Sequence, residues 1–233
     1  MRINRYLADS GVCSRRQADK LIEEKRVMIN GKHAAIGAEV ADNDTVTLDG
    51  APVKRVHKYT YLLLNKPKGC ISSVSDEFNR KTVMDYIDIK DKRLFPVGRL
   101  DYDSEGMLII TDDGELANRL THPANEIYKT YIVKTQGLPS EEDLNRLRRG
   151  VIIDGKKTNR SYIKLLESDD NGSRLEVKIS EGRNHQIKKM FEAIGREVKF
   201  LKRVAIGDLR LGGLMRGEYR RLKDEEVYYL KNL

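Results

Sequence analysis

The fold of this chain is constrained most by residues 98–114, where a short apolar run lies between two polar segments. Residues 107–110 are Met-Leu-Ile-Ile, and glycines stand on both sides of them. Four apolar residues bounded by turn residues predict a short buried strand. Residues 115–120 begin with an acid, which favours a helix there because a negative charge suits the helix dipole. The loop before the strand is therefore held by the core, and catalytic side chains are often placed on such loops.

Three charged side chains occupy this predicted loop: Arg99, Asp101 and Asp103. Charges beside a buried strand are also typical of an ordinary solvated turn. The position in the loop does not by itself choose between Asp101 and Asp103 as a reactive carboxylate.

The charge of the chain favours a polyanionic partner. Its net charge is +8 over 233 residues, and its pI is about 9.3. The cations are clustered: residues 1–32 carry eight Lys and Arg against four acids, and residues 183–203 carry seven against two. Clusters of one sign are what phosphate binding requires. Nucleic acid is the simplest partner of this kind.

Other features limit the setting and the class. The two cysteines, Cys13 and Cys70, are far apart and form neither a disulfide framework nor a zinc motif. The chain shows no signal-peptide pattern, no apolar stretch of transmembrane length and no nucleotide-cofactor or metal motif. We therefore expect a cytoplasmic protein without a cofactor, a metal or a membrane partner.

Residues 1–50 predict a small module of two helices and a hairpin. Ile3, Tyr6 and Leu7 have helical spacing, and Ser14 with Gln17 predicts the capped start of a second helix. Asn30-Gly31 is a strong two-residue turn between strands. Residues 52–59 are short, polar and basic, as is usual for an interdomain linker.

The rest of the chain predicts a mixture of strands and helices. Helices are expected at residues 82–87, 141–149, 187–194 and 224–230. Strands are expected at residues 27–29, 46–48, 61–64, 107–110, 128–133, 151–153, 162–166, 174–179, 198–204, 209–211 and 219–222.

Several sequence words resemble one known family. Gly-Arg-Leu-Asp-x-x-Ser-x-Gly-x-Leu, followed by Thr-Asp-Asp-Gly, starts at Gly98 and is similar to the signature of RsuA-type ribosomal RNA pseudouridine synthases. Lys66-Pro67-Lys68-Gly69, Lys129-Thr130-Tyr131 and the word Glu-Gly-Arg-Asn-His-Gln-Ile-Lys-Lys-Met from Glu181 resemble further motifs of that family. The C-terminal segments at Ile206 and Gly217 resemble it too. Ser14-Arg15-Arg16-x-Ala-Asp, with Ile29-Asn30-Gly31, resembles an S4 RNA-binding domain.

The resemblance implies roles for Asp101, Tyr131 and Lys188. Asp101 falls on the catalytic nucleophile of the family, and Tyr131 on the tyrosine that stacks on the target base. Lys188 falls on the cation that pairs with the catalytic Asp, a position that is often Arg in the family; Lys would act there as a point charge. Arg99 lies close enough in sequence to bind phosphate or to help expel the base.

The resemblance also implies RNA-contacting side chains in both parts of the chain. His185 has the chemistry of a general base, but at a polar helix start we expect it to contact the RNA backbone. The expected RNA-binding residues are Arg2, Arg5, Ser14, Arg15, Arg16, Lys20, Lys66, Lys68, Arg183, Asn184, His185 and Gln186. Lys66 and Lys68 are explained equally well as ordinary surface lysines.

These inferences predict an α+β protein with an S4 RNA-binding domain and linker at residues 1–58. A mixed, mainly antiparallel-sheet pseudouridine synthase domain is expected at residues 59–233. The expected activity is isomerisation of uridine to pseudouridine in ribosomal RNA, in which the target base is flipped out of its stack. The protein is expected to be a monomer. A stem-loop of 23S RNA is favoured over 16S as the substrate. The alternative is a noncatalytic S4-domain protein that binds RNA or assists ribosome assembly.

Overall fold

The computed structural model describes residues 1–55 and 58–233, which form two compact units. The first unit contains residues 1–60, 89–94 and 111–114, and the second contains residues 61–88, 95–110 and 115–233. The predicted domain boundary at residues 58/59 stays a prediction, and the predicted linker includes residues 56–57, which lie outside the described residues. No helix in the described ranges is long and apolar enough to cross a membrane.

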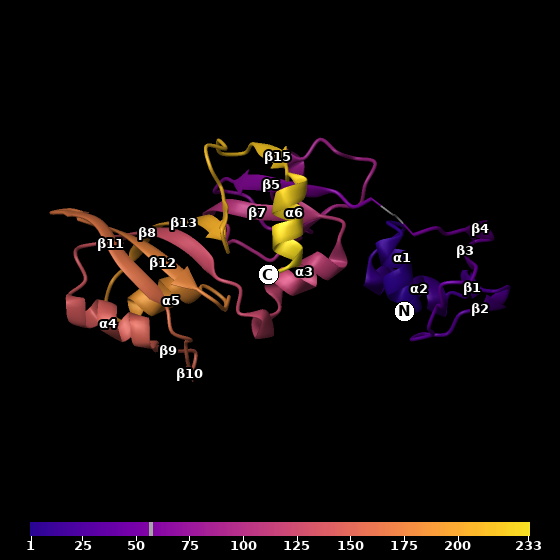
Figure 1. The fold of residues 1–233 in the computed structure, drawn as a ribbon, viewed down its shortest axis with the longest axis horizontal. Coiled ribbons are helices and arrows are strands. Elements are labelled where there is room, and N and C mark those ends of the chain that lie inside the picture. The colour runs from indigo at the N-terminus through magenta and orange to yellow at the C-terminus, as the bar shows by residue number, and fades with distance from the viewer. Residues whose placement is uncertain (56–57) are drawn as a thin grey trace. The chain divides into compact units, whose positions relative to one another are not determined.

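The first unit combines two helices with a four-stranded sheet (Figure 1). The Ser14 hydroxyl accepts a hydrogen bond from the Gln17 N–H at 3.1 Å and caps the second helix as predicted. Asn30 and Gly31 both have positive φ angles, as the tight turn between β1 and β2 requires. Ile3, Leu7 and Val27 are fully buried in its core. The elements are α1 (Ile3–Asp9), α2 (Arg15–Glu23), β1 (Val27–Ile29), β2 (Lys32–His33), β3 (Val46–Leu48) and β4 (Ala51–Pro52).

The second unit is built on a sheet with the strand order β11-β12-β8-β13-β7-β5-β15, to which β14 and β6 add at β13 and β7. The neighbours β11, β12, β8 and β13 are antiparallel, whereas β7 runs parallel to β13. The strands are β5 (Tyr61–Lys66), β6 (Phe95–Val97), β7 (Glu105–Thr111), β8 (Lys129–Gln136), β11 (Tyr162–Asp169), β12 (Gly172–Ile179), β13 (Val198–Ile206), β14 (Leu209–Arg210) and β15 (Tyr219–Arg221). A separate hairpin pairs β9 (Ile152–Ile153) with β10 (Lys156–Lys157).

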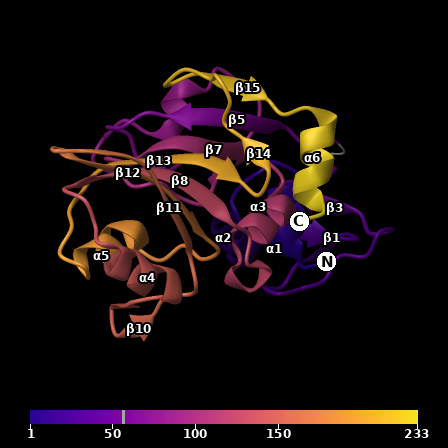
Figure 2. The same cartoon turned by 60° about the vertical axis from the view of Figure 1, so that its left-hand side comes forward.

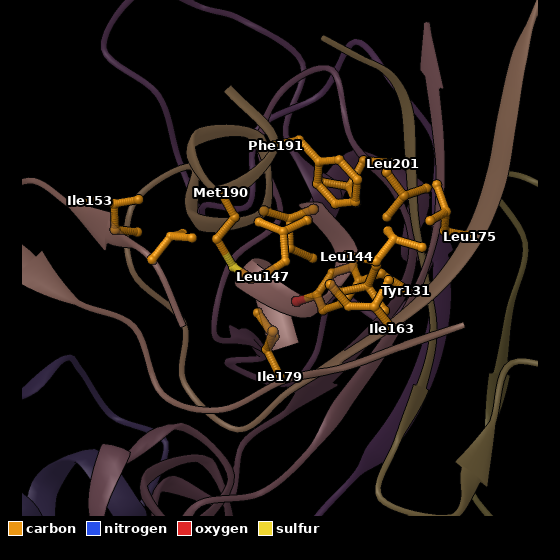
Figure 3. Packing of buried hydrophobic residues seen from close by; sticks show 14 of the residues in the cluster. Tyr131, Leu144, Leu147, Ile153, Ile163, Leu175, Ile179, Met190, Phe191 and Leu201 are labelled. Carbon is orange, nitrogen blue, oxygen red and sulfur yellow. The ribbon is translucent and has the colours of Figure 1, made fainter. Parts of the chain in front are cut away.

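Helices cover the sheet of the second unit and create its two apolar cores. Figures 1 and 2 show α4 and α5 on one face of β11, β12 and β8. Leu144 and Leu147 of α4 and Met190 and Phe191 of α5 pack there against Leu175 (Figure 3). A second core joins α3 and α6 to β5 and β7. The helices are α3 (Gly114–Thr121), α4 (Glu141–Arg149), α5 (Gln186–Glu192) and α6 (Asp224–Lys231), with 3₁₀ turns η1 (Val83–Tyr86) and η2 (Pro123–Asn125).

The predicted α+β class with mainly antiparallel sheet is confirmed, while some element types and bounds differ. Residues 82–87 form one 3₁₀ turn instead of a longer helix. Asp85 bonds back to the Thr82 N–H, and the chain returns to extended geometry at Ile87. The predicted strand at residues 107–110 runs from Glu105 to Thr111 and is buried along its whole length. It is the strand that carries the loop of Asp101.

The strand β7 approaches β13 closely at Gly106. A Cβ at this position would lie 2.2 Å from the Arg203 carbonyl oxygen, and the φ angle of Gly106 is +111°. Only glycine fits this combination of space and backbone angle. Gly106, the second glycine of the motif that starts at Gly98, therefore lets the strand lie directly against Arg203.

Candidate active site

The loop between β6 and β7 brings Asp101 to the N-terminal end of α5. The Asp101 carboxylate lies 3.4 Å from the Lys188 Nζ and 3.6 Å from the His185 Nε2. Its side chain is 24% exposed, so it can meet both a ligand and these partners. Residues more than eighty positions apart therefore form one charged cluster.

A cleft of about 370 Å³ lies beside this cluster in the second unit. Asp101 and Arg99 line it from the loop, and Tyr131 lines it from β8. His185 and the neighbouring residues 180–187 complete the wall. The side chain of Arg99 is exposed. The cleft therefore gathers Asp101, Arg99, Tyr131 and His185, while Lys188 reaches Asp101 from one turn inside the helix.

Lys188 is shared between two carboxylates. Its Nζ donates a hydrogen bond to Asp103 at 2.6 Å, closer than its 3.4 Å approach to Asp101. Burial raises the pKa of Asp103, but the hydrogen bond and charge of Lys188 outweigh this effect and lower the pKa below its ordinary value. Asp103 thus does more than shape the turn: it competes with Asp101 for the same cation.

Tyr131 belongs both to the cleft and to the apolar core. It is 8% exposed and lies among the aliphatic side chains of the core beneath α4 and α5 (Figure 3). Its backbone pairs with Val177 on β12 and with Arg203 on β13. Packing on both sides fixes the ring, so Tyr131 presents a rigid surface to the cleft.

Lys66, which the sequence predicts to contact RNA, is buried in the structure. Its side chain is fully buried, and its Nζ donates to the carbonyl oxygens of Asp101 and Ser104 at 2.9 Å each and of Pro67 at 3.1 Å. Burial lowers the pKa of Lys66, and the nearby Asp101 and Asp103 charges offset part of this shift. Lys66 therefore cannot touch RNA; it binds the backbone on both sides of the Asp101 loop turn. The sequence did not show that Lys66 is buried, because consecutive residues of β5 are buried and an alternating pattern is therefore absent.

Gln186, in the motif that starts at Glu181, is a second predicted RNA contact that the structure buries. Gln186 is 4% exposed; its Nε2 donates to Glu181 at 2.7 Å, and its Oε1 accepts from the Arg183 N–H at 2.9 Å. Gln186 is thus a buried support of the loop rather than an RNA contact. Arg183 donates to Glu181 and to the carbonyls of the β10 hairpin. Asn184 and His185 are exposed at the helix start.

The predicted contacts of the first unit differ in accessibility. Arg5 lies 3.4 Å from Asp9, and Ser14 caps α2. The side chains of Arg2, Arg15, Arg16 and Lys20 are exposed, as is Lys68 in the second unit.

Two cations at the base of the cleft were not predicted. Arg203 is 5% exposed; its Nε donates to the Met107 carbonyl at 2.7 Å, and its Nη2 has no hydrogen-bond partner in the described part of the chain. Burial, together with the charge of Arg203, lowers the pKa of Lys129 to about 8. Lys129 stands two residues before Tyr131, so the alternation of β8 was the available signal.

Comparison with known proteins identifies the class of this fold and site. The RNA pseudouridylate synthase family matches residues 60–193, and the S4 domain matches residues 1–46. The chain therefore belongs to the RNA pseudouridylate synthase family and is an enzyme of that class carrying an S4 domain.

Individual relatives match along the whole chain. The Bacillus subtilis (strain 168) protein named ribosomal large subunit pseudouridine synthase B is 43% identical over 235 residues, covering 100% of this chain and 96% of its own length. The Escherichia coli (strain K12) dual-specificity RNA pseudouridine synthase RluF is 35% identical, covering 100% of this chain and 79% of its own length. A crystal structure of a pseudouridylate synthase superposes with a TM-score of 0.71 at 32% identity and covers 99% of both chains.

The buried ammonium of Lys66 generates a prediction about stability. Lys66→Met keeps much of the side-chain volume but removes the ammonium that donates to three backbone carbonyls, of which those of Pro67 and Asp101 each keep one other donor. We expect the free energy of unfolding to fall by about 2 kcal/mol, measured by urea titration with far-ultraviolet circular dichroism. Lys68→Met, two residues further along and exposed, is the matched control and should change it by less than about 0.5 kcal/mol. Equal unfolding curves for Lys66→Met and wild type would show that the ammonium does not hold the loop.

Proposed function

We propose that this chain isomerises a uridine of ribosomal RNA to pseudouridine, with Asp101 as the nucleophile. The observation that supports this most is the position of Asp101, on a rigid loop at a cleft and within 3.6 Å of two cation-forming side chains. The family match gives the reaction class. The relatives' names, which specify ribosomal large subunit RNA in one case, support the substrate.

The reaction needs no group from outside the substrate. The bond between N1 of uracil and C1′ of ribose breaks, the base turns, and C5 forms a new bond to C1′. The hydrogen at C5 leaves as a proton, and N1 ends with one. We assign to Asp101 the stabilisation or capture of the electron-poor C1′, as carboxylates do in glycoside chemistry.

The remaining groups at the cleft hold the base and the carboxylate. The target nucleotide must leave its stack to reach Asp101, and the fixed ring of Tyr131 offers a surface on which the base can stack. Lys188, 3.4 Å away, would orient the Asp101 carboxylate. Arg99 is exposed at the cleft wall and would bind a phosphate of the flipped nucleotide.

The first unit would hold RNA outside the cleft. The exposed cations at the start of α2, Arg15 and Arg16, together with Arg2 and Lys20, are suited to phosphate contacts. We further propose that the protein acts as a monomer in the cytoplasm on a stem-loop of large-subunit RNA. Asn184 and His185 would contact the backbone beside the cleft.

The role of Asp101 is tested against its neighbour Asp103. Asp101→Asn is nearly isosteric and leaves the backbone carbonyl that Lys66 binds, so folding and RNA binding should survive. It removes the negative charge, and we expect turnover to fall by at least about 1,000-fold. Asp103→Asn should cost less than about tenfold, since it leaves Lys188 to Asp101 alone. The assay is tritium release from ribosomal RNA labelled at uracil C5.

Two results would contradict this assignment. Near-wild-type release by Asp101→Asn would remove Asp101 as the nucleophile. Absence of release by the wild-type protein, with RNA binding retained, would favour the noncatalytic S4-domain alternative.

Lys188 generates a second expectation. Lys188→Arg keeps a cation within reach of Asp101 and should retain turnover within about tenfold of wild type. Lys188→Met leaves both carboxylates without that cation and should lower kcat by at least about 100-fold, with a smaller effect on KM. Single-turnover tritium release separates the two parameters. If Lys188→Met kept the wild-type kcat, His185 would become the better candidate for the partner of Asp101.

The target RNA is tested in cells. In a strain that lacks this gene, we expect one or more pseudouridines to disappear from 23S RNA and none from 16S RNA. Chemical mapping of pseudouridine in both ribosomal RNAs measures this directly, and a plasmid copy carrying Asp101→Asn serves as the control that should not restore the modification. Loss confined to 16S RNA would overturn the large-subunit assignment.

A further inference from the structure

The sheet of the second unit has a second face that the proposed mechanism does not use. Along β12, buried residues alternate with half-exposed ones, because only one face packs against α4 and α5. The residues that point the other way on β11, β12, β8 and β13 form what we call the open face. Its members are Tyr162, Lys164, Glu167, Arg174, Glu176, Lys178, Ile132, Lys134, Phe200 and Lys202.

Strand register places these residues in rows across four strands. Lys164, Glu176, Ile132 and Lys202 are successive partners in one row. The next row contains Glu167, Arg174, Lys134 and Phe200. The pairing of the strands thus brings Lys134 beside the ring of Phe200, although the two residues are far apart in the sequence.

The two rows carry more cations than acids. Both acids of the two rows are already engaged, since Glu167 lies 2.7 Å from Arg174 and Glu176 lies 3.6 Å from Lys178. Lys134, Lys164 and Lys202 have no acidic partner within the described ranges. Three lysines are therefore left to attract an anion. Charged residues are depleted at the centres of protein–protein interfaces, so the composition does not suit a protein partner.

Aromatic rings stand among these cations. The Nζ atoms of Lys68 and Lys134 lie 5.2 and 6.0 Å from the centre of the Phe200 ring. Tyr128 and Tyr162 form an edge-to-face pair with ring centres 5.9 Å apart, and Tyr162 is 67% exposed. Tyr162 therefore keeps most of its surface open to a ligand while its ring is held by Tyr128.

Two hollows accompany the rings. One of about 490 Å³ is lined by Phe200, Ile132, Lys134 and Lys202. The other, of about 450 Å³, is lined by Tyr128, Tyr162 and Lys178. Arg210 lines both, so the two hollows are neighbours on the sheet.

Aromatic rings on a β-sheet, flanked by lysine and arginine, are the means by which proteins hold single-stranded nucleic acid. Bases stack on the rings while the cations contact the phosphates. This surface is separate from the cleft, because Tyr131 points to the α4–α5 side of β8 whereas its neighbour Ile132 points to the open face.

We propose that the open face binds a single-stranded segment of the RNA substrate, distinct from the nucleotide that enters the cleft. The proposal rests on the proposed function only in taking the enzyme's own substrate as the RNA. Lys68, which the sequence predicted as an RNA contact, belongs to this surface through its approach to Phe200.

The electrostatic part is tested with two double variants of the full chain. Lys134→Ala/Lys202→Ala removes two cations of the open face. Arg146→Ala/Arg149→Ala removes two exposed cations from α4, which covers the opposite face. The probes are the ribosomal RNA transcript of the tritium assay and a labelled oligouridylate, each titrated over a range of KCl concentrations.

We expect the Lys134/Lys202 variant to bind both probes about tenfold more weakly at moderate salt. The slope of log K against log[KCl] should become shallower by about 1.4, the value for two lost contacts to a single strand. KM in the tritium assay should rise in parallel. The α4 variant should match wild type in all three measurements. Unchanged binding by the Lys134/Lys202 variant, or an equal loss in both variants, would overturn the proposal.

The stacking part is tested at Phe200. Phe200→Leu keeps an apolar side chain in the sheet but removes the aromatic face, and should weaken oligouridylate binding at least about fivefold. Phe200→Tyr keeps the ring and should bind within about twofold of wild type. Photocrosslinking of 5-bromouridine RNA, mapped by mass spectrometry, should label Phe200 or Tyr162. Crosslinks confined to the cleft and the first unit would contradict the proposal.

These outcomes separate the two proposals. If the wild-type protein released no tritium but the Lys134/Lys202 variant still lost affinity, the open face would stand and the proposed activity would fall. If tritium release were normal and both double variants bound RNA like wild type, the activity would stand and the open face would fall.

Discussion

The buried ammonium of Lys66 is the interaction on which the geometry of the site depends. It donates to backbone carbonyls of Pro67, Asp101 and Ser104, and so ties the end of β5 to the loop that carries the candidate nucleophile. Without this ammonium the Ser104 carbonyl would lose its buried side-chain donor, whereas the carbonyls of Pro67 and Asp101 would keep one donor each, from the Cys70 Sγ and the Ser104 N–H. Burying a charge is costly, but here its donors are satisfied and its position beneath two carboxylates lowers that cost.

Asp101 and Asp103 compete for the same cation, Lys188. Lys188 lies closer to Asp103 than to Asp101, and His185 approaches Asp101 from the helix start. Asp101 is thus held by longer contacts than its neighbour, which leaves its carboxylate available to a bound ligand. Arg203 and Lys129 add positive charge at the base of the same cleft. A phosphate-bearing substrate would enter a field that favours it.

The sheet explains how one strand can contribute to two surfaces. Alternate residues of β8 face opposite sides, so Tyr131 joins the cleft and the apolar core while Ile132 and Lys134 join the open face. Helices α4 and α5 cover only one side. The other side carries lysines beside the rings of Phe200 and Tyr162. Substrate binding outside the cleft would add affinity without altering the reacting groups.

The sequence by itself determined the features that depend on nearby residues. The Asn30-Gly31 turn, the cap at Ser14 and the helix at Glu141–Arg149 follow from local backbone and capping chemistry, and the α+β class follows from their pattern. The family motifs also brought Asp101 and Lys188 into consideration. Only the tertiary structure decided that Lys66 and Gln186 turn inward, that Lys188 is shared with Asp103, and that Lys129 and Arg203 meet beneath Tyr131. These contacts join strands and helices far apart in the chain, and their geometry is set by sheet register and packing, which no local pattern encodes.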